Sequence, residues 1–318
     1  MKMTVELYIC AENKRHFFSS VRAFSSYKQL RPDLRKAFTQ VVFRDYLERN
    51  GFNSVREFTT CLRSKERHRY NAPHEIDTGR FYSELESNYW YKLARGQIIT
   101  NRKTIFCVDD AIGLLDLLGL SHPFWKLLNR SINVCFSAYL LPVELRKQIF
   151  IHHNFHHNLS PEKFSNNIKR QYLCQLEKLY AYKSIDSLHA LTLLCIGYHY
   201  RDGDKQSKKA EKYLYAQFLY LMMYKYKIEK IFEIFVYMKF LLECNSLYKN
   251  KVGEALNIEQ LEVDLSVVQG YIQSARSLPK IEQEKIISSK ILTYLNALPH
   301  HPYFRIYENK TQTKSTKH

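Results

Sequence analysis

The sequence predicts an all-α protein in two parts, of which the second is an irregular antiparallel helical bundle. Three observations predict it. Glycine and proline are scarce, at 9 and 8 of 318 residues. Apolar residues recur three to four positions apart, and the strict alternation typical of strands is rare. Hydrophobic residues make up 45% of the chain, which is enough for a substantial core.

The first helix is expected within residues 31–52. Pro32 suits the first helical turn, and Asn50-Gly51 suits the end of the helix. A second helix should follow, with Asn53 or Ser54 as its N-cap. The apolar positions that predict the buried face of the first helix are Leu34, Phe38, Val41, Val42 and Tyr46. Only "TVELYIC" near the start and "HPYFRIY" near the end resemble short strands.

From about Ser160 onward the chain predicts a series of helices with short connections, which favours antiparallel packing. Ser160 is the expected cap of one of them, with Pro161 at its first position. We expect a helical domain over residues 1–155, a helical bundle over 156–300 and a basic tail over 301–318.

The stretch "SNYWYKLARGQIITNRKTIF" (87–106) contains a helix, a stop and a second helix start. Trp90 and Leu93 are three apart and can share a buried face, and Gly96 stands where a helix end requires positive φ. This pattern resembles the second half of a phage-repressor-type helix-turn-helix, over about Glu86–Leu118. The resemblance implies DNA binding, by an N-terminal part that is helix-turn-helix-like.

The charge of the chain also favours a nucleic-acid partner. Lys and Arg number 48 against 31 Asp and Glu, a net charge of +17, which attracts phosphate backbones. If the helix lies in a major groove, its exposed polar residues contact the DNA. The residues expected to face bases are Ser87, Asn88 and Tyr91, and those expected to contact phosphates are Lys92, Arg95, Arg102 and Lys103.

A second pattern lies in "ALTLLCIGYHYRDGDKQSKKAEKYLYAQ". Gly197-x-x-Tyr200-x-x-Gly203, followed by Ala210 and Tyr213, resembles one unit of the tetratricopeptide-related repeats, over about Ser187–Met222. The spacing predicts two helices that approach closely at Gly197 and Ala210, with the tyrosines filling the gap. The resemblance implies a surface for protein partners.

Candidate chemistry is sparse. The pairs His152/His156 and His153/His157 have the spacing of metal ligands on a helix, but they follow the expected helix end, so loop histidines are the better interpretation. Arg63 and His68 have the spacing found in HEPN-like helical ribonucleases. No nucleotide-binding or hydrolase motif occurs. We therefore expect no catalytic residue, no metal and no cofactor.

The seven cysteines are scattered, which is typical of reduced thiols in a cytoplasmic protein. No apolar run is long enough to cross a membrane. The leading hypothesis is a non-enzymatic nucleic-acid-binding protein, DNA over RNA, whose C-terminal helices contact a protein partner or form a homodimer. The alternatives are a helical adaptor of a multiprotein complex and, third, a ribonuclease that uses Arg63 and His68.

Overall fold

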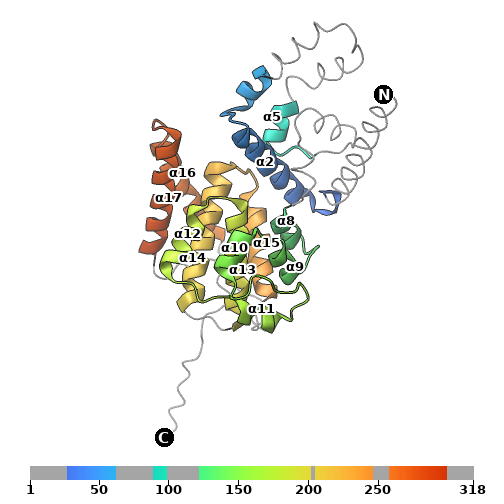
Figure 1. Cartoon of the computed structure of the whole chain (residues 1–318). Helices are drawn as coiled ribbons and strands as arrows, with labels where there is room; N and C mark the ends of the chain where they lie inside the picture. Colours follow the sequence, from blue (N-terminus) through green and yellow to red (C-terminus); the bar gives the residue numbers. More distant parts are fainter. Residues whose placement is uncertain (1–26, 62–88, 99–121, 202–204, 246–257, 299–318) are drawn as a thin grey trace, which may run out of the picture. The chain divides into compact units, whose positions relative to one another are not determined.

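A computed structural model describes residues 27–61, 89–98, 122–201, 205–245 and 258–298 (Figure 1). Within these ranges the regular elements are helices, and the only strand-like feature is an isolated bridge between Phe150 and Ile168. The all-α prediction is confirmed. The two segments that resemble strands, at residues 4–10 and 301–307, and the expected basic tail lie outside the described residues.

The chain forms two compact units. Unit 1 comprises residues 1–129 and 228–230, and unit 2 comprises residues 130–227 and 231–318. Residues 130–155, which the sequence grouped with the N-terminal part, belong to unit 2 in the structure. The backbone explains why: the Ile151 N–H donates to the Asn167 carbonyl at 2.8 Å, and the Lys169 N–H donates to the Ile149 carbonyl at 2.9 Å.

The main helix of unit 1 is α2 (Pro32–Arg49), which begins at a proline and has Asn50 as its C-cap. Gly51 follows with φ +75°. All five residues predicted for its apolar face are buried. A further helix starts at residue 55, and its cap is Ser54, whose Oγ accepts the Glu57 N–H at 3.1 Å. The expected start and end of α2 are thus confirmed.

Aromatic rings make up much of the unit 1 core. The Trp90 ring stacks on Phe43 with centroids 5.9 Å apart, and Phe58 meets Trp90 edge-on at 5.1 Å. On the short helix α8 (Pro123–Leu128), Trp125 lies edge-on to Phe38 at 6.2 Å. Both tryptophans of the chain are therefore buried in unit 1.

Unit 2 is an irregular helical bundle around α13 (Ile185–Arg201), which is buried along most of its length. Ser160 caps α11 (Pro161–Asn167) by accepting the Lys163 N–H at 3.3 Å, as predicted. The remaining helices are α9 (Val134–Tyr139), α10 (Val143–Ile149), α12 (Leu173–Ala181), α14 (Lys205–Leu219), the π-helix η1 (Tyr220–Lys225), α15 (Ile231–Cys244), α16 (Ile258–Ser274) and α17 (Lys280–Ala297).

Helices α13 and α14 pack closely together, as expected for the tetratricopeptide-like hairpin. The sequence predicts that Gly197 allows α14 to approach, but this choice of partner helix was wrong. A Cβ at Gly197 would lie 2.5 Å from Cγ1 of Ile168, at the end of α11. The Ser165 hydroxyl donates to the Gly197 carbonyl at 2.6 Å across the same contact. The glycine therefore lets α13 approach α11, whereas Tyr213 packs on Tyr180 of α12.

A buried carboxylate joins three helices at one side of unit 2. Asp264 on α16 accepts hydrogen bonds from the hydroxyls of Tyr215 on α14 at 2.6 Å and of Tyr294 on α17 at 2.8 Å. Gln260 also donates to it, at 3.0 Å. Burial and the Asp264 carboxylate raise the pKa of Tyr294. A buried acid with this many donors fixes the positions of α14, α16 and α17.

Candidate functional site

The short helix α5 (Tyr89–Ala94) carries the residues that the sequence assigned to the core, and the predicted stop, Gly96, lies in the turn that follows it. Trp90 and Leu93 are 4% and 0% exposed, and Gly96 has φ +82°, as predicted. The Gly96 N–H donates to the Leu93 carbonyl at 2.9 Å, which closes the helix. A Cβ on Gly96 would lie only 2.7 Å from the Lys36 carbonyl oxygen. Glycine is thus required both for the turn and for contact with α2.

Three of the predicted contact residues lie on α5 or in the turn that directly follows it. Tyr91, Lys92 and Arg95 are exposed. Four others, Ser87, Asn88, Arg102 and Lys103, lie outside the described residues, as do the helices expected before and after α5. The helix-turn-helix arrangement and the contacts of those four residues therefore stay predictions.

Lys92 and Arg95 line a pocket of about 240 Å³ in unit 1. Lys36 and Gln40 of α2 and the Gly96 turn contribute to its wall, together with residues 228–230. The close approach of Gly96 to α2 brings these two helices together. The pocket thus collects residues from three segments that are far apart in the sequence.

The pocket is strongly basic. Its lining includes Lys36, Lys92, Arg95 and Lys230 but only one acidic residue, Glu229. Lys230 is paired with Asp33, at 3.4 Å between Nζ and Oδ1. The other three cations form no ion pair with any described residue. Three cations with no ion-pair partner in the described part of the chain, with Glu229 as the one acidic residue of the lining, can bind an anion with several oxygens, such as a phosphate.

Sequence reasoning found two of these three cations and missed Lys36. Lys92 and Arg95 stood out because they flank the buried pair Trp90 and Leu93 in one helix. Lys36 lies more than fifty positions upstream, and only the packing of Gly96 on α2 makes it their neighbour. No local pattern in α2 distinguishes Lys36 from the exposed lysines in other parts of the chain.

The histidine cluster lies in a loop, as expected. Helix α10 ends at Ile149, before the first of these histidines. Among the residues that the structure describes, no group of three His, Cys, Asp or Glu side chains could hold a metal. The His157 ring instead packs against two aromatic residues, Phe136 and Tyr139, with centroids 5.9 and 6.1 Å away.

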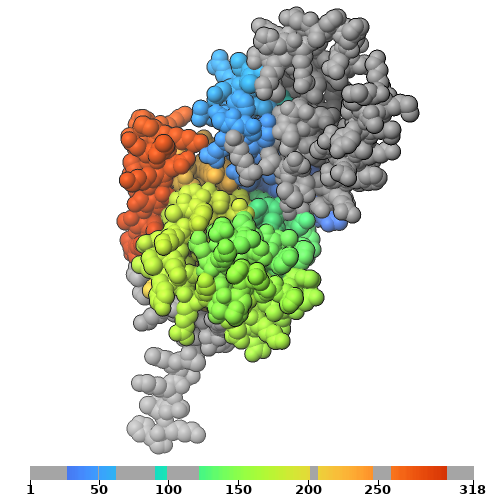
Figure 2. All heavy atoms as spheres, in the orientation of Figure 1, coloured from blue at the N-terminus to red at the C-terminus, as the bar shows by residue number. Residues whose placement is uncertain are grey.

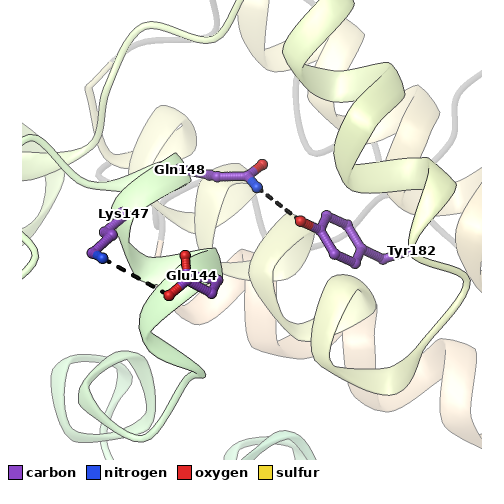
Figure 3. Close-up of polar contacts among 4 residues, drawn as sticks. All are labelled: Glu144, Lys147, Gln148 and Tyr182. Carbon is purple, nitrogen blue, oxygen red and sulfur yellow. Dashed lines mark hydrogen bonds and ion pairs between the residues drawn. The ribbon is translucent and has the colours of Figure 1, made fainter.

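Helix α10, which precedes this loop, carries side chains that form polar contacts within the helix and with Tyr182 (Figure 3). Glu144 and Lys147 form an ion pair of 3.8 Å on one side of the helix. Gln148 donates through Nε2 to the hydroxyl of Tyr182, the C-cap of α12, at 3.0 Å. The ion pair lies within α10, and only the hydrogen bond from Gln148 joins α10 to the end of α12. Exposed ion pairs of this kind contribute little to stability.

Two side-chain clusters in unit 2 have the composition of catalytic groups but not their access. Ser137 and His189 approach within 2.5 Å, and both are 0% exposed. His199 forms a hydrogen bond with Glu211 near Cys195, and these residues are also buried. Burial raises the pKa of the Cys195 thiol, which keeps it protonated. Because substrate reaches neither cluster, we assign both to the core.

Arg63 and His68, the pair with ribonuclease spacing, lie outside the described residues. No described helix is long and apolar enough to pass through a membrane. No protein-family model matches this sequence, and no curated protein or solved structure compared with it matches either. Functional inference therefore depends on the residues of the chain itself.

Proposed function

We propose that this protein binds nucleic acid, DNA in preference to RNA, and that it does so without catalysis. The observation that carries the proposal is the basic pocket of unit 1, where Lys36, Lys92 and Arg95 surround one hollow without acidic partners among the described residues. Phosphate groups are the anions that such a site fits, since guanidinium and ammonium groups donate several hydrogen bonds to them.

The charge of the whole chain supports the same partner. A net charge of +17 attracts a polyanion over a long range, and contacts between cations and phosphates account for most sequence-independent binding. Tyr91, which precedes Lys92 on α5, is 39% exposed. A tyrosine beside such cations is suited to contact a sugar or a base once the phosphates are bound.

The experiment is a binding titration by fluorescence anisotropy at low salt, with a labelled DNA duplex and an RNA duplex of the same sequence. The variant carries Lys36→Glu, Lys92→Glu and Arg95→Glu. A matched control reverses the charge of three exposed lysines of unit 2 by changing each to glutamate. They are Lys178, Lys208 and Lys285. We expect the pocket variant to bind DNA at least about tenfold more weakly than the control.

The fold of the variant can be checked independently. Both tryptophans are buried in unit 1, so their fluorescence reports whether the unit that carries the pocket remains folded. Equal losses of affinity in the folded pocket variant and in the control would show that the pocket has no special role. Absence of binding by the parent protein to either duplex at low salt would overturn the proposal altogether.

A second candidate function is a helical adaptor or a homodimer formed through the C-terminal helices. Two aliphatic side chains favour it: Ile281 on α17 is 82% exposed and Val263 on α16 is 51% exposed. The surface of these helices is continuous with that of α12 and α14 (Figure 2). Sedimentation velocity tests this alternative, because a dimer through this surface should dissociate when Val263 and Ile281 are changed to lysine.

A further inference from the structure

Unit 2 has an exposed aromatic and apolar surface at the junction of α9 and α10. We call it the α9–α10 surface. Its apolar members are 37% to 46% exposed and lie within eight consecutive residues, and such clustering of exposed apolar side chains is typical of an interaction surface. They are Phe136, Tyr139, Leu140 and Val143.

The rings of the α9–α10 surface are held in place by their neighbours. The exposed His157 packs against Phe136 with an interplanar angle of 80°, and against Tyr139 with an angle of 59°. The Arg146 guanidinium lies over the Tyr139 ring, 5.3 Å from its centroid. Because these rings are already ordered, a partner that stacks on them loses little of its binding free energy to side-chain entropy.

The stretch of chain that carries the α9–α10 surface is basic. Residues 130–172 contain six Lys or Arg, two Glu and four His, which gives a net charge of +4 with the histidines neutral. Arg146 forms no ion pair with any described residue. Its Nε is buried and has no hydrogen-bond partner among those residues. Exposed rings beside an unpaired guanidinium, on a basic stretch of chain, favour an anionic partner that also has flat apolar groups.

Resting on the nucleic-acid binding proposed above, we infer that the α9–α10 surface stacks unpaired nucleobases. A strand of unpaired nucleotides has both features that the surface fits: base faces for Tyr139 and Phe136, and a phosphate for Arg146. A duplex has the phosphates but conceals the base faces within its own stack. The chain is therefore expected to bind nucleic acid that includes an unpaired segment.

The test compares a short labelled thymidine strand with an abasic strand of the same length, which retains the phosphates but has no bases. In Tyr139→Ala, affinity for the thymidine strand should fall about tenfold, while affinity for the abasic strand stays unchanged. Tyr139→Phe keeps the ring and should bind like the parent, which separates loss of stacking from loss of structure.

The matched control is Tyr172→Ala. Tyr172 is more exposed, at 68%, and packs on no ring or guanidinium within the described part of unit 2. Equal losses in Tyr139→Ala and Tyr172→Ala, or an equal loss on the abasic strand, would overturn the inference. So would unchanged strand binding combined with loss of self-association, because the surface would then be a protein interface.

The two proposals fail in different ways. If the parent binds neither strand nor any duplex, nucleic-acid binding itself is refuted and the inference falls with it. If the parent binds duplex DNA through Lys36, Lys92 and Arg95 but Tyr139→Ala has no effect on the thymidine strand, only the stacking surface is refuted.

Discussion

Gly96 lines the basic pocket and packs closely on α2. Its φ of +82° is costly for any residue with a Cβ, and its distance from the Lys36 carbonyl leaves no room for a methyl group. Gly96→Ala should therefore lower the free energy of unfolding of unit 1 by about 2 kcal/mol or more. Urea denaturation followed by tryptophan fluorescence measures this, because both tryptophans lie in unit 1.

Gly51 provides the control for Gly96. It has a similar φ of +75°, but a Cβ there would meet nothing within 4 Å. Gly51→Ala should lower the free energy of unfolding by only about 1 kcal/mol, which is the backbone penalty alone. Equal effects of the two substitutions would show that the contact between Gly96 and α2 adds nothing.

The burial of Lys183 predicts that the stability of the protein depends on pH. Its Nζ lies 2.9 Å from the Tyr180 ring centroid, and burial lowers its pKa to about 7, although the charge of Glu284 opposes the shift. The unfolded chain holds this proton up to a pH near 10.5, whereas the folded chain releases it near 7. Between these values the unfolded state binds more protons, so stability rises with pH.

The measurement is urea denaturation followed by circular dichroism between pH 7 and 9, below the range in which the tyrosines titrate. Lys183→Met should make the stability curve flatter than that of the parent, whereas Lys178→Met, on the exposed side of α12, should not. A curve for Lys183→Met with the same slope as the parent would mean that Lys183 remains charged throughout.

At the scale of elements, the contact between α11 and α13 can be tested with a double-mutant cycle. A methyl group at Gly197 would collide with the buried Ile168, so Gly197→Ala should cost about 1–3 kcal/mol of unfolding free energy. Ile168→Ala alone leaves a cavity and should cost about 2–5 kcal/mol. Because the alanine at 168 removes the collision, the double variant should be more stable than the sum of the two losses predicts.

Additive losses in that cycle, measured by denaturation followed by circular dichroism, would contradict the assigned contact. The original expectation placed Gly197 against α14, so the cycle also tests the correction. A parallel pair, Gly197→Ala with Ala210→Gly on α14, should be additive, because the atoms that a Cβ at Gly197 would meet first all belong to Ile168.

Sequence patterns predicted elements well where the signal was local. Pro32 and Asn50 mark the ends of α2, Ser54 and Ser160 cap their helices, and Trp90 and Leu93 are buried. Each of these depends on residues within one or two turns of the helix. The partner of Gly197 could not be predicted, because a glycine indicates a close approach without indicating which helix approaches.

At the scale of the whole molecule, the sequence likewise does not indicate which distant segments come together at the candidate sites. Lys92 and Arg95 were predicted, yet Lys36 and residues 228–230 join them only through tertiary packing. The α9–α10 surface was also missed, because exposure of Phe136 and Tyr139 is not visible in a sequence that contains many buried aromatic residues. Net charge favours a polyanionic partner but does not indicate where such a partner would bind.

The measurement that tests the central claim most directly is the salt dependence of DNA-duplex binding. Lys36→Gln, Lys92→Gln and Arg95→Gln together remove three positive charges from the pocket, and a control removes three from Lys178, Lys208 and Lys285 of unit 2. If all three pocket cations contact phosphates, the slope of log affinity against log salt should become shallower by about 2–3 in the pocket variant. The control should retain nearly the parent slope. Identical slopes in the parent and the pocket variant would contradict the account.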